Sequence, residues 1–287
     1  MAQSKKHLKK AIGIAVVLVL SVMFQTIVSG TAFQEDALAV WVFDIGQGDA
    51  IFIDGPLVQV LIDGGPDGSV LEKLSAVMPF WDHDIDLLIN SHPHKDHVEG
   101  LAHVLERYDV SAVWDSGQEY GTDTFAYYQQ LSEPIHNSTH AGETYDLGGG
   151  AVLTVLWPAY NVSDQRLPNP HDGNVTVLLT YGDTTVLLTG DMESEVEAQI
   201  VDELPHIDVL KVGHHGSLTS TSPELLQAIT PDYAVISVGA DNDYGHPHPV
   251  ILDRLQRAGV RILRTDEDGD VRIRSTGAEP EVTLFHL

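Results

Sequence analysis

The chain has 287 residues, enough for one large domain or two small ones, and 43% of them are hydrophobic, so a sizeable core can form. It contains no cysteine, which excludes disulfide bonds and thiolate ligands and leaves His, Asp, Glu and Asn as the residues that could bind a metal. Because 42 Asp and Glu residues outnumber 15 Lys and Arg residues, an extended basic surface for nucleic acid is also excluded.

Residues 1–38 predict an export signal or a single membrane anchor, followed by a short spacer. The basic segment KKHLKK precedes an apolar run at residues 11–28 and the small residues VSGTA, which is the layout of an export signal. The run is also close to the length of about 20 residues that spans a bilayer. Because the basic end stays inside, we expect the remainder to be extracytoplasmic, either secreted after cleavage or anchored to the cell membrane.

The remainder is strongly acidic. After residue 34 the chain has 11 basic and 42 acidic residues, and only Lys73, Lys95 and Lys211 are lysines. One interpretation is a protein that repels nucleic acid at low salt. We favour adaptation to high salt in a halophilic archaeon, because the acidic residues are scattered along the chain and salt screens their repulsion. Adaptation to high salt leaves an anionic substrate open.

Short runs rich in Val, Ile and Phe predict strands, and apolar residues at helical spacing predict helices between them. The predicted strands are residues 39–45, 50–54, 58–63, 84–89, 111–114, 152–157, 175–181, 185–188, 209–212 and 233–238. Three further short strands are predicted after residue 258. The predicted helices are residues 70–78, 98–108, 124–131, 194–201, 223–229 and 249–258. Residues 133–150 and 158–173 are expected to be mostly loop. Two similar blocks of elements without a linker indicate one α/β domain over residues 39–287.

Four potential metal ligands follow the predicted strand at residues 84–89, within the segment NSHPHKDHVEG. They are His92, His94, Asp96 and His97, and the loop that carries them leads into a predicted helix. Imidazole and carboxylate groups suit Zn, Mn or Fe. In an extended loop His92 and His94 can point to the same side, so we expect one ion at this pair and a second ion at Asp96 and His97.

Other polar motifs also come directly after predicted strands. LLTGDME places Asp191 at a strand end, and LKVGHHGS places His214 and His215 at another. One of these two histidines is expected to complete the second metal site, and we favour His214 because it comes first after the strand. Lys211 in the same motif could contact a phosphate or be a salt-bridged surface lysine. VLIDGG places Asp63 at a third strand end, where a turn residue is equally expected from the sequence alone.

The pattern H-x-H-x-D-H at residues 92–97 matches the signature of the metallo-β-lactamase fold. Together with FDIGQGDA, LLTGD, LKVGHHGS and NDYGHPHP, it makes residues 40–275 resemble the extracytoplasmic hydrolase domain of the ComEC family of competence proteins, which function in DNA uptake. The resemblance implies an αββα sandwich in which Asp191 bridges two ions and Asp63 steadies the histidine loop. It also makes His246 and His248 of GHPH candidates to contact substrate or protonate the leaving oxygen.

The usual third histidine of the first metal site has no clear match. The ComEC-like pattern has Asn at that place, which maps to Asn174, and His171 lies three residues earlier, where it could substitute if the loop folds back. The competence channels also carry many membrane spans, whereas this sequence predicts at most one. We therefore expect a stand-alone hydrolase domain that binds one or two ions of zinc or manganese.

The resemblance implies a phosphodiesterase or nuclease that acts on a phosphoester substrate such as extracellular DNA. Hydroxide held between two cations is the expected nucleophile, since paired cations make water nucleophilic near neutral pH. Asp96, Lys211, His246 and His248 are the candidate catalytic residues. Two alternatives stay open, namely another secreted ester hydrolase similar to phosphorylcholine esterases, and a non-catalytic binding module for DNA uptake.

Overall fold

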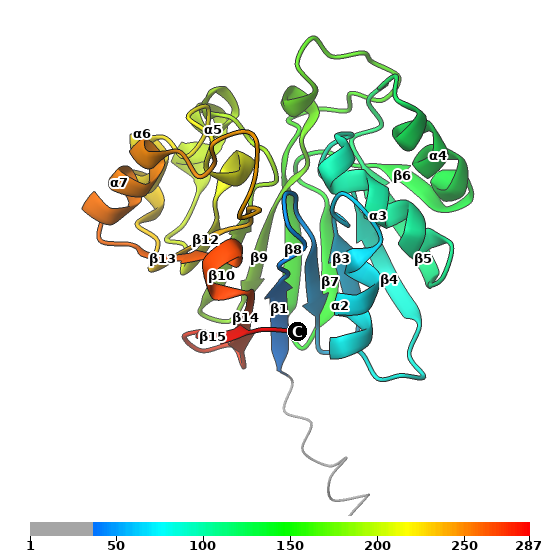
Figure 1. Cartoon of the computed structure of the whole chain (residues 1–287), viewed down its shortest axis with the longest axis horizontal. Coiled ribbons are helices and arrows are strands. Elements are labelled where there is room, and N and C mark those ends of the chain that lie inside the picture. Colours follow the sequence, from blue (N-terminus) through cyan, green and yellow to red (C-terminus); the bar gives the residue numbers. More distant parts are fainter. Residues whose placement is uncertain (1–36) are drawn as a thin grey trace, which may run out of the picture. The chain divides into compact units, whose positions relative to one another are not determined.

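Two β-sheets pack face to face, and helices cover the outer face of each sheet (Figure 1). The structure, a computed structural model, describes residues 37–287, and Leu38–Leu287 form one compact unit. The predicted export segment lies outside the described residues, apart from its last two positions. Among residues 37–287, no helix combines the length and the apolar character needed to cross a membrane.

The first sheet has eight strands in the order β15-β14-β1-β2-β3-β4-β5-β6, and the second has seven in the order β13-β12-β11-β10-β9-β8-β7. The first is formed by β1 (Leu38–Val42), β2 (Ile51–Asp54), β3 (Gln59–Ile62), β4 (Asp84–Ile89), β5 (Asp109–Asp115), β6 (His136–Ser138), β14 (Asp270–Ser275) and β15 (Glu281–Phe285). The second is formed by β7 (Thr144–Gly148), β8 (Ala151–Trp157), β9 (Thr176–Tyr181), β10 (Thr184–Leu188), β11 (Val209–Lys211), β12 (Tyr233–Ile236) and β13 (Arg261–Arg264).

Alternation of side chains along the strands divides the core into three apolar layers. Val40 of β1 is buried between the sheets with Leu153 of β8 and Val186 of β10, whereas the neighbouring Trp41 packs on the outer face. The outer layers lie under α2 (Ser69–Val77), α3 (Lys95–Leu105) and α4 (Asp123–Ser132) on the first sheet, and under α5 (Ser194–Ile200), α6 (Pro223–Ile229) and α7 (Pro249–Arg257) on the second (Figure 1). The short α8 (Thr265–Asp268) connects β13 to β14.

The predicted αββα sandwich is confirmed, and the predicted helices and strands are found within a few residues of their expected bounds. The main difference is in residues 133–150, where β6 and β7 form in a segment predicted to be mostly loop. β6 pairs with β5 and β7 pairs with β8, each at the edge of its sheet. Both strands are short and polar, so their sequences carry no alternating apolar pattern that would predict them.

Two groups of parallel strands determine where the polar loops meet. β3, β4 and β5 are parallel in the first sheet, and β10, β11, β12 and β13 are parallel in the second. The carboxyl ends within each group therefore lie at one edge, and in α/β sheets ligands bind beyond such ends. The motifs with Asp63, His92, Asp191 and His214 all follow these strands.

Candidate metal centre

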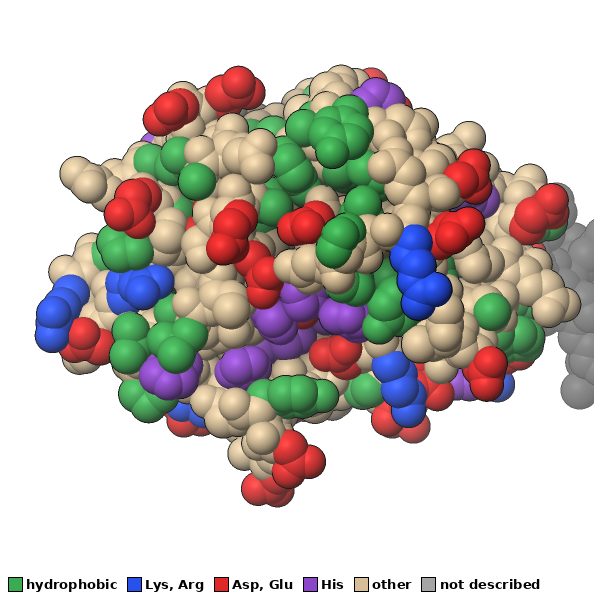
Figure 2. Space-filling view, turned by 90° about the horizontal axis from the view of Figure 1, so that it is seen from above, with side chains coloured by type: hydrophobic (Ala, Val, Ile, Leu, Met, Phe, Trp, Pro, Cys, Tyr) green, Lys and Arg blue, Asp and Glu red, His purple; other side chains and the backbone are tan. Residues whose placement is uncertain are grey.

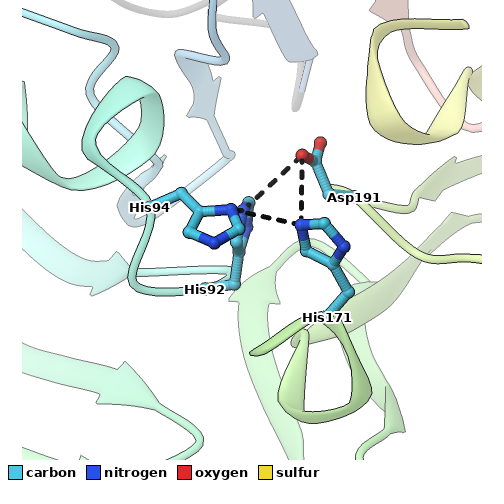
Figure 3. A group of neighbouring side chains, drawn as sticks. All are labelled: His92, His94, His171 and Asp191. Carbon is cyan, nitrogen blue, oxygen red and sulfur yellow. Dashed lines mark hydrogen bonds and ion pairs between the residues drawn. The ribbon is translucent and has the colours of Figure 1, made fainter. Parts of the chain in front are cut away.

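The first group of potential ligands consists of three histidines and one oxygen of Asp191 (Figure 3). His92 Nε2 lies 3.0 Å from His94 Nδ1, which lies 3.1 Å from His171 Nε2. Asp191 Oδ2 is 3.5 Å from His92 Nε2 and 3.9 Å from His171 Nε2. Ligands about 2.0–2.1 Å from a tetrahedral zinc ion are separated by roughly 3.4 Å, so this group has the spacing of a metal site.

A second group lies on the other side of Asp191 and uses the other oxygen of its carboxylate. Asp191 Oδ1 is 3.6 Å from both His97 Nε2 and His215 Nε2. Asp96 Oδ2 completes the group, 3.8 Å from His97 Nε2 and 3.4 Å from His215 Nε2. Because one oxygen of Asp191 faces each group, its carboxylate is placed to bridge two cations.

Buried atoms without partners show that the second group fits a cation. His97 Nε2, His215 Nε2 and Asp191 Oδ1 are buried and have no hydrogen-bond partner among the described residues. Leaving such groups unpaired costs about 1–3 kcal/mol each. A divalent ion would satisfy all three atoms, since its ligands are neutral imidazoles and ionised carboxylates.

The ring nitrogens on the far side of these histidines hold them in the orientation that metal binding requires. His97 Nδ1 lies 2.8 Å from Asp63 Oδ2, and His215 Nδ1 lies 2.9 Å from the carbonyl oxygen of Ser237. Because a carbonyl or carboxylate oxygen accepts the proton of Nδ1, the lone pair is left on Nε2, toward the ion. Asp63 also accepts hydrogen bonds from the amide and hydroxyl of Ser91 at 2.7 and 2.6 Å, so it steadies the histidine loop.

The electrostatic environment separates the two groups. Burial lowers the pKa of His92 well below its usual value and that of His94 to about 4, so both imidazoles are neutral and ready to bind metal at neutral pH. Burial also opposes protonation of His97, but the carboxylates of Asp191 and Asp63 outweigh it and raise the pKa of His97 well above its usual value. In metal-free protein a proton on His97 therefore balances the negative charge of Asp191 and Asp63, and a bound cation would replace that proton.

His171 and not Asn174 lies with His92 and His94. A short 3₁₀ turn, η2 (Pro170–Gly173), folds the loop back so that His171 faces the first group. This is the backbone course that His171 needs to take the place of the usual third histidine. The buried Asn174 instead supports the backbone: its Oδ1 accepts a hydrogen bond from the amide of Asp191 at 2.9 Å, and its Nδ2 donates to the carbonyl of Thr189 at 2.8 Å. The expectation of Asn174 as a ligand is corrected, because its amide is already used.

His215 and not the favoured His214 lies with His97 and Asp96. Both residues sit in the turn η4 (Gly213–Gly216) with positive φ angles of 47° and 52°, and this left-handed backbone aims their side chains in different directions. His214 Nε2 lies 3.7 Å from Asp191 Oδ2, on the side of the first group. Its Nδ1 lies 3.2 Å from the hydroxyl of Thr219 and 3.6 Å from Glu193.

Lys211 is neither a phosphate contact nor a surface lysine. Its side chain is 1% exposed, and Nζ lies 2.8 Å from Asp49 Oδ2 and donates to the carbonyl of Val212. Asp49 Oδ1 lies 3.6 Å from His215 Nδ1, so the ion pair supports the back of the second group. The motif FDIGQGDA contains Asp49, but nothing in the sequence assigns it a partner 162 positions away.

An open pocket of about 350 Å³ gives access to both groups, and Figure 2 shows the histidine side chains gathered in a hollow among scattered acidic side chains. It is lined by Gln47, His94, Lys95, Asp96, Asp191, His214, His215, Tyr244 and His246. His248 does not line it, because this residue caps α7, where its Nδ1 accepts a hydrogen bond from the amide of Val250. Gln47 lies in the motif FDIGQGDA and Tyr244 in NDYGHPHP, but neither motif predicts a role for these two residues.

The chain is similar in sequence to one protein family and to several known proteins. The family model described as "Metallo-beta-lactamase superfamily" matches residues 43–240. The chain is 32% identical over 256 residues to ComE operon protein 3 of Bacillus subtilis, covering 80% of the chain and 32% of that protein. It is 32% identical over 272 residues to Recombination protein 2 of Haemophilus influenzae, covering 93% of the chain and 32% of that protein. The chain thus spans about a third of the length of these relatives.

A third relative, Competence protein ComA of Neisseria gonorrhoeae, is 27% identical over 245 residues, covering 83% of the chain and 32% of that protein. Among solved structures, the metallo-β-lactamase fold protein YhfI of Bacillus subtilis has a TM-score of 0.55 at 14% identity and covers 87% of the chain and 100% of YhfI. The diiron β-hydroxylase CmlA of Streptomyces venezuelae has a TM-score of 0.55 at 16% identity, covering 86% of the chain and 54% of CmlA. At such identities the likeness concerns the fold.

Proposed function

Because the chain belongs to the metallo-β-lactamase superfamily and has the fold of metal-dependent hydrolases, we propose that it hydrolyses phosphodiester bonds. The observation that carries the proposal is the position of Asp191, whose two carboxylate oxygens face two separate groups of ligands at the floor of an open pocket. The first site would use His92, His94 and His171, and the second would use Asp96, His97 and His215. When bound, a pair of cations supplies an activated water and stabilises charge on the phosphate oxygens.

The residues around this centre are suited to handle the proton of the leaving group. His214 is held by Thr219 and Glu193 through Nδ1, so its Nε2 faces the pocket, 3.7 Å from Asp191 Oδ2. His246 lines the same pocket with its ring 6.0 Å from that of His214. Burial lowers the pKa of both histidines, but an entering phosphate brings negative charge that favours their protonated forms. Either imidazolium can then protonate the departing oxygen.

The charge of the pocket favours a diester. Lys95 is the single Lys or Arg residue among those that line it, and Asp96 and Asp191 contribute negative charge. When the two ions that Asp96 and Asp191 would hold are bound, Lys95 is the one further positive charge, and it matches the single negative charge of a phosphodiester better than the charge of up to two on a phosphomonoester. The relationship to competence proteins supports DNA as the source of the diester.

The place of action is part of the same proposal. The basic and apolar start of the chain supports export or anchoring, which would put the pocket outside the cytoplasm. The acidic composition supports a salty environment, and the metal centre would hold zinc or manganese, since His and Asp ligands suit both. Protease added to intact cells should digest a tag at the carboxyl end, whereas full protection of that tag would contradict export.

A substrate panel tests the reaction class. Protein freed of metal and then reloaded with zinc or manganese is offered a phosphodiester, a phosphomonoester, a lactone and a β-lactam, each at several salt concentrations. We expect the highest kcat/KM with the phosphodiester, and no turnover of it without metal. Turnover of the lactone or lactam with no cleavage of any phosphodiester would overturn the proposal and leave only the class of metal-dependent hydrolases.

A further inference from the structure

We infer that Tyr244 forms a stacking subsite for a nucleobase of the substrate, next to the metal centre. The inference rests on the proposed phosphodiester hydrolysis and specifies which substrates it prefers, namely unpaired nucleotides. The side chain of Tyr244 is 70% exposed, so it contributes little to the hydrophobic core. The ring lines the pocket over the metal ligands and is therefore available to an incoming substrate.

Tyr244 also borders a second depression that continues from the first. This depression has a volume of about 330 Å³ and shares Gln47, Lys95, Asp96 and Tyr244 with the pocket over the metal centre. Its remaining lining comes from Pro66 and residues 241–243. A substrate with its phosphate at the metal centre can therefore extend past the tyrosine ring into a further space of comparable size.

The loop that carries Tyr244 is held in shape by its own hydrogen bonds. The side chain of Asn242 donates to the carbonyl oxygens of Gly239 and His246 at 2.8 and 2.7 Å, and its Oδ1 accepts from the amides of Tyr244 and His246 at 3.2 and 3.0 Å. The Tyr244 ring lies nearly parallel to that of His246, with 5.8 Å between centroids and 17° between planes. Because the backbone of the loop is already ordered, little backbone freedom is lost when a ligand stacks on the ring.

The charges around the ring favour a base over a phosphate. Lys95 is the single Lys or Arg residue that lines either depression, whereas Asp241 and Asp243 line the second one. These carboxylates repel phosphate groups and accept hydrogen bonds from the amino groups of bases. Stacking on an aromatic ring does not depend on charge and is sequence-tolerant. Since a base within a duplex is already stacked on both faces, the ring selects unpaired nucleotides.

The test compares two substrates that each contain one phosphodiester bond: a dinucleoside monophosphate, and its counterpart with hydrogen in place of both bases. Metal-loaded wild-type protein should cleave the first with the higher kcat/KM. Tyr244→Ala should lower the ratio of the two kcat/KM values by about 5-fold to 150-fold, which is the range of base stacking on aromatic side chains. Tyr244→Phe should retain the ratio, because it keeps the ring. The matched control is Tyr160→Ala, which removes another exposed tyrosine, outside both depressions.

Each outcome separates the subsite from the reaction. If Tyr244→Ala lowers kcat/KM for both substrates equally, or for neither, the stacking subsite is wrong while phosphodiester hydrolysis stands. If wild-type protein cleaves both substrates equally well, the subsite is wrong as well. If metal-loaded wild-type protein cleaves neither, the proposed function is overturned and the subsite with it. Elemental analysis of each variant verifies that the metal centre is intact.

Discussion

His214 and His215 are adjacent in sequence, but their positions predict different effects of substitution on metal binding and on turnover. His215 lies with Asp96 and His97, so His215→Ala should remove the ion of the second group. His214 is 22% exposed and faces the pocket, so His214→Ala should keep both ions and slow phosphodiester turnover, by about 10²–10⁴-fold if it is the proton donor. Elemental analysis and kinetics of both variants check this. Loss of metal in His214→Ala with full metal in His215→Ala would contradict the geometry.

His97 predicts how metal binding depends on pH. Burial lowers its pKa, but Asp191 and Asp63 raise it above the unfolded value, so in metal-free protein His97 stabilises the fold below that unfolded value. This contribution is lost as the pH rises through the folded pKa, and metal binding strengthens over the same range because the ligand must lose its proton. The difference in Tm between metal-loaded and metal-free protein should therefore grow as the pH rises from the usual imidazole pKa of about 6.5 toward the raised pKa of His97. A difference that shrinks would contradict it.

Helix α3 carries Asp96 and His97, and close packing against a turn after β3 fixes its position. The amide of Gly64 donates to the carbonyl of His97 at 2.8 Å, and the amide of Gly100 donates to the carbonyl of Gly65 at 3.1 Å. A Cβ at Gly100 would collide with the backbone of Gly64, so no side chain can move to relieve the clash. The absence of a side chain at this position is therefore what lets the helix approach the turn.

Gly100→Ala tests this contact. In an open helix this change adds about 1 kcal/mol of stability, but here we expect it to lower the free energy of unfolding by about 1–3 kcal/mol or more and to weaken metal binding. The matched control is Gly121→Ala, where the added Cβ would meet only the Arg166 side chain at 3.8 Å. Chemical denaturation and metal titration measure both effects. Equal stability of Gly100→Ala and wild-type protein would show that α3 can shift freely.

The elements also show how far the sequence predicts the site. Strand ends followed by His or Asp identified Asp63, His92, Asp191 and the pair of His214 and His215 from the sequence, and the parallel pairing of the strands brings these ends together. The histidine that joins His92 and His94 was not decided by sequence, since the backbone turn at η2 selects His171. The ion pair of Lys211 was not predicted either, because its partner, Asp49, comes from a loop that is distant in sequence. The left-handed backbone of η4 also turns His215, and not the expected His214, toward Asp96 and His97.

At the level of the whole molecule, the acidic surface predicts stabilisation by salt. The chain after residue 34 has 42 acidic and 11 basic residues, and raising the salt to 1 M shortens the Debye length from about 10 Å at 0.1 M to about 3 Å. The free energy of unfolding should therefore rise between these concentrations of KCl. Changing the exposed Glu119, Glu203 and Glu279 together to Gln should reduce this dependence. A free energy that falls with KCl would contradict adaptation to high salt.

Asp191 is central to the proposed hydrolysis of a phosphodiester, because its carboxylate would hold both cations. The most direct measurement titrates metal-free protein with zinc or manganese while phosphodiester hydrolysis and bound metal are followed together, for wild-type protein, for Asp191→Ala and for the control Asp183→Ala, which changes an exposed turn residue. We predict that hydrolysis by wild-type and control protein reaches its maximum at two bound ions per chain, and that Asp191→Ala loses most of its metal and its turnover. Wild-type metal content in Asp191→Ala, or a metal-saturated wild-type protein without phosphodiester hydrolysis, would contradict the claim.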